Sequence, residues 1–133
     1  MQSITGTWQM IRTECLDDSG DQLAPPYGSE TGMGLLSLRD DGRMVCVLCD
    51  SRAELPQNQA REYNSYCGAY HFDGAQLTTR VDASANTDWI GSEQIRDVSF
   101  EGEIMVLRPV KNNGPSSAGQ RVLYWVRLPA VDS

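Results

Sequence analysis

The sequence predicts an all-β protein, an antiparallel up-and-down β-barrel of about eight to ten strands with one short helix or lid segment. Three observations lead to this prediction. The dominant hydrophobic period is two residues rather than 3.6. Short turn signals rich in Asp and Gly separate most of the alternating segments. The chain has 133 residues, enough for a single domain spanning 1–133 and too few for two ordinary domains.

Eight segments carry the alternation expected of strands. They are Gly6–Cys15, Met33–Arg39, Arg43–Cys49, Asn64–Phe72, Gln76–Asp82, Glu93–Phe100, Ile104–Pro109 and Arg121–Leu128. A weaker strand is expected at Gln22–Leu23, before two prolines interrupt pairing. The segment Asp50–Glu62 lacks alternation and is expected to be a short helix or a lid-like loop, and Lys111–Gly119 a flexible hairpin loop. Consecutive antiparallel strands of this kind favour a closed barrel, with a sandwich as the alternative.

The charge and the rare residue types exclude several classes of function. Eleven basic and 18 acidic residues give a net charge of −7, which argues against nucleic acid or an anionic membrane as the main partner. A buried Schiff-base lysine is not expected, because the single lysine, Lys111, lies in a Gly/Asn/Ser-rich stretch. One histidine, His71, excludes a multi-histidine metal site. No phosphate loop, haem motif or metal-ligand cluster is visible, so we expect neither cofactor nor metal.

The four cysteines indicate a reducing compartment. No signal peptide and no apolar run of membrane-spanning length is visible, so Cys15, Cys46, Cys49 and Cys67 are expected to be reduced thiols in a cytoplasmic protein. Cys46 and Cys49 form a C-x-x-C pair, but they lie in an expected strand. Residues three apart in a strand point to opposite faces, so the pattern does not favour a redox or zinc role.

Several short motifs carry a resemblance to a known family. They are Gly6-Thr-Trp8, Asp41-Gly-Arg-Met44, Tyr66-x-Gly-x-Tyr70-x-x-Asp73, Ala83-Ser84, Trp89-x-Gly91-x-x-Gln94-x-Arg96 and Leu123-x-Trp125-x-Arg127. From about Gly6 to Leu128 the chain resembles the bacterial and fungal lipocalin-like domain family. The resemblance implies a calyx-shaped barrel closed at one end by Trp8; some members lie in biosynthetic gene clusters. The chain departs from the family pattern at Thr79-Arg80, where a histidine is expected.

Alternation then predicts which side chains face the barrel interior. Because the resemblance places Trp8 inside, Met10, Arg12 and Glu14 are expected to face inward with it. The other expected inward residues are Leu36, Leu38, Met44, Cys46, Leu48, Tyr66, Gly68, Tyr70, Phe72, Gln94, Arg96, Val98, Phe100, Leu123, Trp125 and Arg127. His71 is expected to face outward. These assignments assume that no β-bulge intervenes, since a bulge reverses every face beyond it.

This interior suits a pocket for a small, largely hydrophobic molecule with a polar or anionic group. The candidate ligand-binding residues are Met10, Arg12, Met44, Cys46, Tyr66, Tyr70, Trp89, Gln94, Arg96 and Trp125. Structural alternatives remain for several of them: Trp125 as core packing, Gln94 and Arg96 as a satisfied polar network, and Arg12 reaching solvent. Arg127 is expected to cover the Trp8 ring as a structural lid.

Three functions are consistent with this pattern. We favour a binding protein, a lipocalin-like carrier or sensor. The alternative is a cofactor-independent cyclase or isomerase acting on a biosynthetic intermediate, with Glu14 or Tyr70 as acid or base and Arg96 stabilising an oxyanion, assisted by Gln94 and Arg12. The third is an interaction module that uses exposed residues such as Tyr63 and the loop around Tyr27. A homodimer is compatible with all three.

Overall fold

The computed structural model describes residues 3–27, 32–110 and 120–131. Within these ranges the chain forms nine strands and the 3-10 turn η2 (Thr87–Trp89), and Pro26 and Tyr27 also have 3-10 conformation. The strands are β1 (Gly6–Leu16), β2 (Gln22–Leu23), β3 (Gly32–Leu38), β4 (Arg43–Asp50), β5 (Tyr63–Phe72), β6 (Gln76–Ser84), β7 (Glu93–Glu101), β8 (Ile104–Pro109) and β9 (Gln120–Arg127). These bounds confirm the expected strands to within two residues. The hairpin loop expected at Lys111–Gly119 lies outside the described residues.

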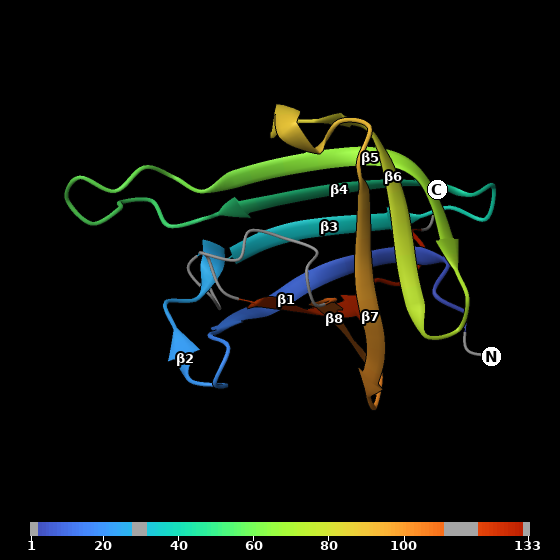
Figure 1. Ribbon diagram of the computed structural model, residues 1–133, viewed down its shortest axis with the longest axis horizontal. Coiled ribbons are helices and arrows are strands. Elements are labelled where there is room, and N and C mark those ends of the chain that lie inside the picture. Colours follow the sequence, from blue (N-terminus) through green and yellow to red (C-terminus); the bar gives the residue numbers. More distant parts are fainter. Residues whose placement is uncertain (1–2, 28–31, 111–119, 132–133) are drawn as a thin grey trace.

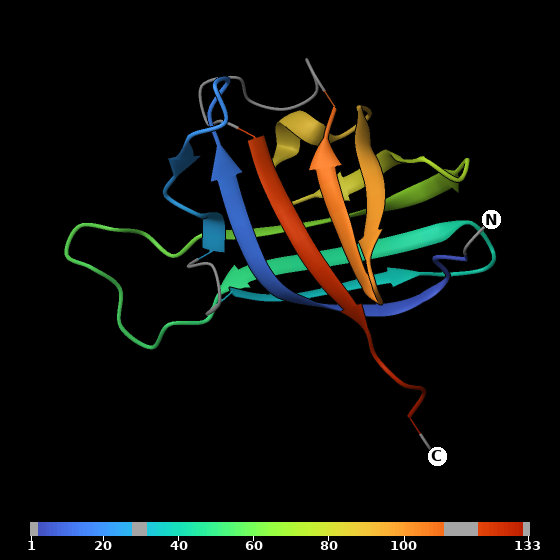
Figure 2. The ribbon, with the colours of Figure 1, turned by 90° about the horizontal axis from the view of Figure 1, so that it is seen from below.

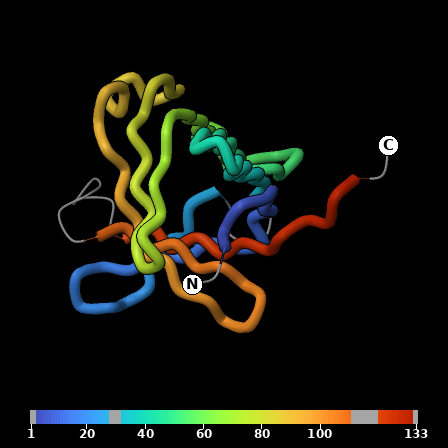
Figure 3. The backbone as a smooth tube through the Cα atoms, turned by 90° about the vertical axis from the view of Figure 1, so that its right-hand side faces the viewer, coloured from blue at the N-terminus to red at the C-terminus, as the bar shows by residue number. Residues whose placement is uncertain are grey.

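The strands form one closed antiparallel barrel. Their order is β2-β1-β3-β4-β5-β6-β7-β8-β9, and β9 pairs back onto β1, so eight of the described strands close the barrel while β2 extends the end of β1. Figure 1 shows β3, β4 and β5 side by side with β6 and β7 crossing them steeply, and Figure 3 looks along β3 and β4. Figure 2 shows β9 between β1 and β8. This closure confirms the barrel and excludes the sandwich.

The connections follow the turn chemistry of the sequence. At the β3–β4 hairpin, Gly42 has φ +85° and its N–H donates to Arg39 O at 3.2 Å, a conformation that residues with a Cβ rarely adopt. Of the two structures expected for the segment between β4 and β5, the loop is confirmed and the helix is wrong. Residues 51–62 project beyond the ends of these strands (Figures 1 and 2).

The barrel interior is filled mainly by large apolar side chains. Residues packed there include Trp8, Met10, Leu36, Leu38, Met44, Cys46, Leu48, Leu77, Met105, Leu107 and Trp125, with Tyr66, Tyr70, Phe72, Val98 and Phe100 against them. Removing each such side chain from water contributes roughly 1.5–3 kcal/mol. The inward faces expected for β3, β4, β5 and β7 are therefore confirmed, and His71 is exposed as expected.

The inward face expected for the second half of β1 is wrong because a β-bulge interrupts it. Met10 pairs with Trp125, yet the next paired residue, Arg12, lies opposite Tyr124, so Ile11 is an extra residue. Trp125 faces the interior, and its neighbour Tyr124 therefore faces outward. Arg12 consequently lies on the outer surface.

Arg12 and Glu14 stabilise the outer wall of the barrel. The guanidinium carbon of Arg12 lies 3.6 Å from the centroid of the Tyr124 ring. Glu14 accepts a hydrogen bond from the Tyr124 hydroxyl and lies 3.4 Å from Arg12 Nη1. These contacts form a small outer cluster over Val122 and Val106, which are buried.

The same bulge turns Thr13 toward the interior. Thr13 pairs with Leu123, and its buried hydroxyl donates to Pro26 O at 2.5 Å. This bond ties the segment after β2 to the barrel wall and places the next residue, Tyr27, inside.

A second irregularity lies where β5 meets β6. Cys67 pairs with Ala83 and Gly68 with Val81, so Asp82 is an extra residue in β6. The backbone of β6 comes so close that a Cβ on Gly68 would lie 1.8 Å from Arg80 O. Only glycine fits at this position.

The outer surface of β3 and β4 is apolar. Met33, Leu35, Val45 and Val47 are about half exposed there, and cross-strand pairing places Leu35 opposite Val47. Among the described residues, no helix is long and apolar enough to cross a bilayer.

Candidate functional site

One end of the barrel is closed by side chains. Trp8 Nε1 donates to Ile4 O at 2.9 Å, and Arg127 covers the indole while donating to Ser3 O at 2.7 Å. Tyr70 lies toward the same end, where its hydroxyl donates to Arg39 O at 2.6 Å. The lid role expected for Arg127 is confirmed.

The opposite end opens into a cavity of about 1100 Å³. Its mouth is bounded by the β1–β2 turn, the end of the β4–β5 loop, the β6–β7 connection and the facing ends of β8 and β9. The apolar wall consists of Leu36, Leu48, Leu77, Leu107, Leu123 and Trp125. A cavity of this size and composition accommodates a drug-sized molecule.

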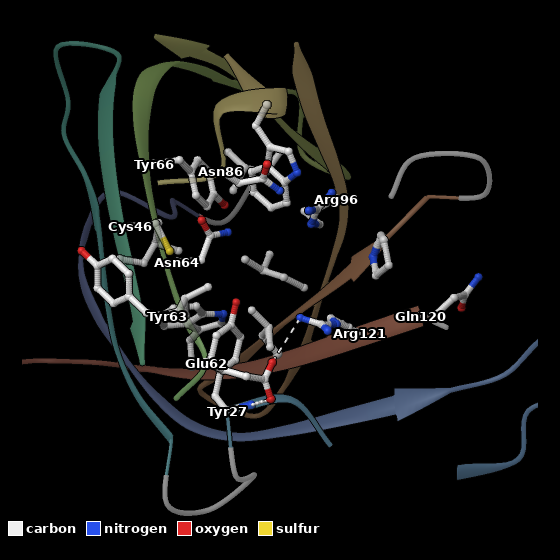
Figure 4. A pocket seen from close by; sticks show the side chains of 18 of the residues that line it. Tyr27, Cys46, Glu62, Tyr63, Asn64, Tyr66, Asn86, Arg96, Gln120 and Arg121 are labelled. Carbon is white, nitrogen blue, oxygen red and sulfur yellow. Dashed lines mark hydrogen bonds and ion pairs between the residues drawn. The ribbon is translucent and has the colours of Figure 1, made fainter. Parts of the chain in front are cut away.

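Four polar side chains from three strands point into this cavity. Cys46 comes from β4, Asn64 and Tyr66 from β5, and Arg96 from β7, and their side chains point into the same space (Figure 4). Tyr66 and Cys46 share a hydrogen bond. We call these four residues the polar cluster.

A chain of hydrogen bonds holds Arg96 in place. Arg96 Nη2 donates to Gln94 Oε1 at 3.0 Å, and Gln94 Nε2 donates to Ser92 Oγ at 3.1 Å. Ser92 Oγ in turn donates to Trp89 O. A second guanidinium nitrogen of Arg96 donates to Ile95 O at 2.9 Å. The direction of Arg96 is thus fixed by its own strand and by the turn before it.

Trp89 connects the turn to the polar cluster. It ends η2, whose start is capped by the Asn86 side chain. The Trp89 ring meets the Tyr66 ring edge to face, with centroids 5.3 Å apart and planes at 71°. This contact fixes the Tyr66 ring beside the mouth.

The Cys46 thiol and the Tyr66 hydroxyl remain protonated at neutral pH. Burial raises the pKa of the Cys46 thiol to about 12, although the Tyr66 hydrogen bond and the Arg96 charge act in the opposite direction. Burial likewise raises the pKa of Tyr66, and Cys46 adds to this effect while Arg96 opposes it. Both groups are therefore hydrogen-bond donors rather than bases or nucleophiles.

Tyr27 narrows the mouth of the cavity. Its backbone has φ +56°, a conformation uncommon for a residue other than glycine, and the residue is only 6% exposed. Glu62 Oε1 accepts from the Tyr27 N–H at 3.1 Å, and Glu62 Oε2 lies 3.6 Å from Arg121 Nη1 (Figure 4). Burial raises the pKa of the Tyr27 hydroxyl to about 12.

The cavity wall also contains a buried donor. Trp125 is 1% exposed, and its Nε1 is the one buried side-chain nitrogen or oxygen of the described residues that lacks a hydrogen-bond partner. Leaving such a donor unpaired costs about 1–3 kcal/mol. A ligand acceptor that reached it would recover that free energy.

The structure brings together half of the residues expected to bind a ligand. Cys46, Tyr66, Trp89, Arg96 and Trp125 line the cavity. Three others lie elsewhere inside the barrel: Met10 and Met44 in the packed core, and Gln94 behind Arg96. Tyr70 lies toward the closed end, and Arg12 lies outside the barrel.

Sequence reasoning missed several residues of the site. Asn64 was detectable, because it shares the inward face of Tyr66 in the same alternating strand. Arg121 was detectable in the same way, because it shares the face of Leu123 and Trp125 in β9. Tyr27 and Glu62 lie in segments without alternation, and only the tertiary structure brings them to Arg121.

The comparisons with known proteins agree with the barrel and its cavity. The family model of the lipocalin-like domain matches residues 5–128, nearly the whole chain. Searches of curated proteins and of solved structures found no match. The matched range includes every strand of the barrel and the described cavity wall, and the chain therefore belongs to the lipocalin-like domain family.

Proposed function

We propose that this protein binds a small, largely hydrophobic molecule that carries a polar group, inside the barrel. The observation that carries the proposal is the cavity of about 1100 Å³, which has a largely apolar wall and several polar side chains pointing into it. Burial of an apolar body supplies affinity, and a few placed polar groups orient it.

Family membership supports small-molecule binding in general. The proposed chemical character of the ligand is inferred from the cavity alone. The exposed apolar surface of β3 and β4 is compatible with an interaction module, but a module of that kind needs no cavity.

The cyclase or isomerase alternative has less support. Its three expected catalytic residues do not meet: Glu14 lies outside the barrel, Tyr70 lies toward the closed end, and Arg96 lines the cavity. Cys46 and Tyr66, which do lie beside Arg96, stay protonated at neutral pH and supply no base.

A neutral fluorescent probe tests the proposal. N-phenyl-1-naphthylamine is apolar and brightens when it leaves water. We expect saturable binding by the wild-type protein and at least tenfold weaker binding by Leu123→Trp, which fills the cavity wall. Leu35→Trp, on the exposed outer surface, is the matched control and should bind as the wild type does.

Native mass spectrometry of freshly purified protein adds an independent measurement. A co-purifying molecule that is present in the wild type and in Leu35→Trp, and absent from Leu123→Trp, supports the cavity as its site. Probe binding that is unchanged in Leu123→Trp contradicts the proposal, because the ligand then binds elsewhere.

The four cysteines support a reducing compartment, the cytoplasm, as the place where this binding occurs. Cys15, Cys46, Cys49 and Cys67 are all free thiols. Cys46 faces the cavity, whereas Cys49 pairs with the exposed Tyr63 on the opposite face.

A further inference from the structure

We propose that the polar group of the ligand is an uncharged hydrogen-bond acceptor, such as the oxygen of a ketone, an ester or an ether, and that the indole N–H of Trp125 donates to it. The ligand enters the barrel with this oxygen first, because Trp125 lies at the inner end of the cavity. This inference rests on the proposed function, since it describes how the same cavity recognises its ligand.

The position of Trp125 along β9 defines its depth in the cavity. Arg121, Leu123 and Trp125 alternate along this strand, and all three line the cavity. Arg121 lies at the mouth, whereas Arg127, the next residue of this face beyond Trp125, covers Trp8 at the closed end. At about 3.4 Å per residue, Trp125 lies roughly 14 Å from Arg121 along the strand. The indole is therefore placed to meet the end of a ligand that enters first.

The unpaired indole nitrogen of Trp125 is the second argument. The residue is 1% exposed, and its Nε1 has no hydrogen-bond partner among the described residues. Trp8 is equally buried, but its Nε1 donates to Ile4 O at 2.9 Å. A buried unpaired donor gains a hydrogen bond from a ligand without giving up an earlier one. A ligand oxygen therefore gains more at Trp125 than at Tyr66, whose hydroxyl already shares a hydrogen bond with Cys46.

The surroundings of the indole select an uncharged acceptor. Trp125 pairs with Met10 of β1 and with Met105 of β8, and all three belong to the buried apolar cluster. An anion among these side chains would lose its hydration at a large cost in free energy. An alcohol or an amine would bring a donor that needs an acceptor of its own. The oxygen of a ketone, an ester or an ether needs only the donor that the indole supplies.

The side chains beside Trp125 allow a ligand to reach its nitrogen. Nε1 is itself buried, so an acceptor touches it only when a neighbouring side chain moves. The direct cross-strand neighbours, Met10 and Met105, are unbranched and have flexible thioethers that adapt to irregular shapes. Movement of one thioether exposes the edge of the indole to the cavity that Trp125 already lines.

Two compounds of one shape test the inference. 2-Acetylnaphthalene carries a carbonyl group where 2-ethylnaphthalene has a methylene group, and the affinity of each is measured by displacement of N-phenyl-1-naphthylamine. Trp125→Phe keeps an aromatic ring and removes the N–H. It should lower the ratio of the affinity for the ketone to the affinity for the hydrocarbon by about tenfold, the value of a buried donor that regains a partner. Trp89→Phe, at another tryptophan that lines the cavity, is the matched control and should leave this ratio within twofold of wild type.

Nuclear magnetic resonance of the wild-type protein gives a second measurement that does not depend on a variant. The chain has three tryptophans, and triple-resonance assignment identifies the indole N–H proton of Trp125. We expect 2-acetylnaphthalene to move this resonance downfield, because a hydrogen bond deshields the proton. 2-Ethylnaphthalene should not move it downfield.

Each outcome supports or overturns a named statement. A lowered ratio in Trp125→Phe together with the downfield movement supports the inference. A ratio that changes less than threefold, a Trp125 resonance that responds equally to the two compounds, or a ketone that does not displace N-phenyl-1-naphthylamine overturns it and leaves the proposed function intact. Failure of the wild type to bind N-phenyl-1-naphthylamine removes the proposed function itself. Thermal melting shows whether each variant is folded, and the wild-type resonance decides alone if Trp125→Phe is not.

Discussion

The guanidinium carbon of Arg127 lies 4.6 Å from the centroid of the Trp8 ring. Trp8 comes from the start of the barrel and Arg127 from its last described strand, and the two residues pair directly across β1 and β9. The contact therefore stabilises the seam between β1 and β9, where the barrel closes. It lies at the end opposite the cavity, so stability and binding can be changed separately.

The first prediction concerns this seam. Arg127→Ala removes the contact with Trp8 and the hydrogen bond to Ser3 O, and should lower the free energy of unfolding by about 1 kcal/mol. Urea denaturation measures the loss. Affinity for the neutral probe should stay within twofold of wild type, and a tenfold loss would show that the closed end takes part in binding.

The second prediction concerns the close approach of β5 and β6. Gly68→Ala places a Cβ against the backbone oxygen of Arg80, which no rotamer change can relieve, and should destabilise the protein by about 3 kcal/mol or more. Ala69→Gly, at the exposed neighbouring position, is the control and should cost at most about 1 kcal/mol. Similar midpoints for the two variants in urea would contradict the close approach of β6 to Gly68.

The third prediction tests the bulge in β1. Arg12→Ala should leave the affinity for the neutral probe within twofold of wild type, because Arg12 faces away from the cavity. It should reduce stability by about 0.5–1 kcal/mol through loss of the contact with the Tyr124 ring. Glu14→Gln should likewise leave binding unchanged. A tenfold loss of affinity in either variant would place these side chains inside the barrel.

The fourth prediction is a loss of stability at alkaline pH. The folded protein holds the protons of Cys46 and Tyr27 up to a pKa of about 12, whereas the unfolded chain releases them near the ordinary pKa values of 9.0 and 10.0. The contribution of these two groups to the free energy of unfolding is complete below pH 9. It declines between pH 9 and 12, since the folded state then binds more protons than the unfolded chain does.

Tyr27→Phe isolates one part of this dependence. The variant should lack the portion of the decline between pH 10 and 12, about 2 to 3 kcal/mol at most. Urea midpoints measured from pH 8 to 11 check this. A profile that coincides with the wild type would mean that the Tyr27 hydroxyl is not buried in the folded protein.

Local sequence patterns were sufficient to predict most strands and inward faces of the barrel. A period of two and Asp/Gly turns identify each strand of the barrel, because side-chain alternation and positive φ are properties of neighbouring residues. The same alternation places Cys46, Tyr66 and Arg96 on inward faces. It fails beyond Met10, because the extra residue Ile11 reverses the faces without leaving a signal in the pattern.

The strands, their turns and most of the inward faces follow from the amino-acid order, since these features depend on residues that are close along the chain. The tertiary structure alone decided how these faces are used. It turned Arg12 and Glu14 outward, left Tyr70 toward the closed end, and brought Tyr27, Glu62 and Arg121 to the mouth. Periodicity along the chain does not encode these features, because they depend on packing between distant segments. Such packing decides how the barrel closes, where its bulges lie and which loops contact one another at the mouth.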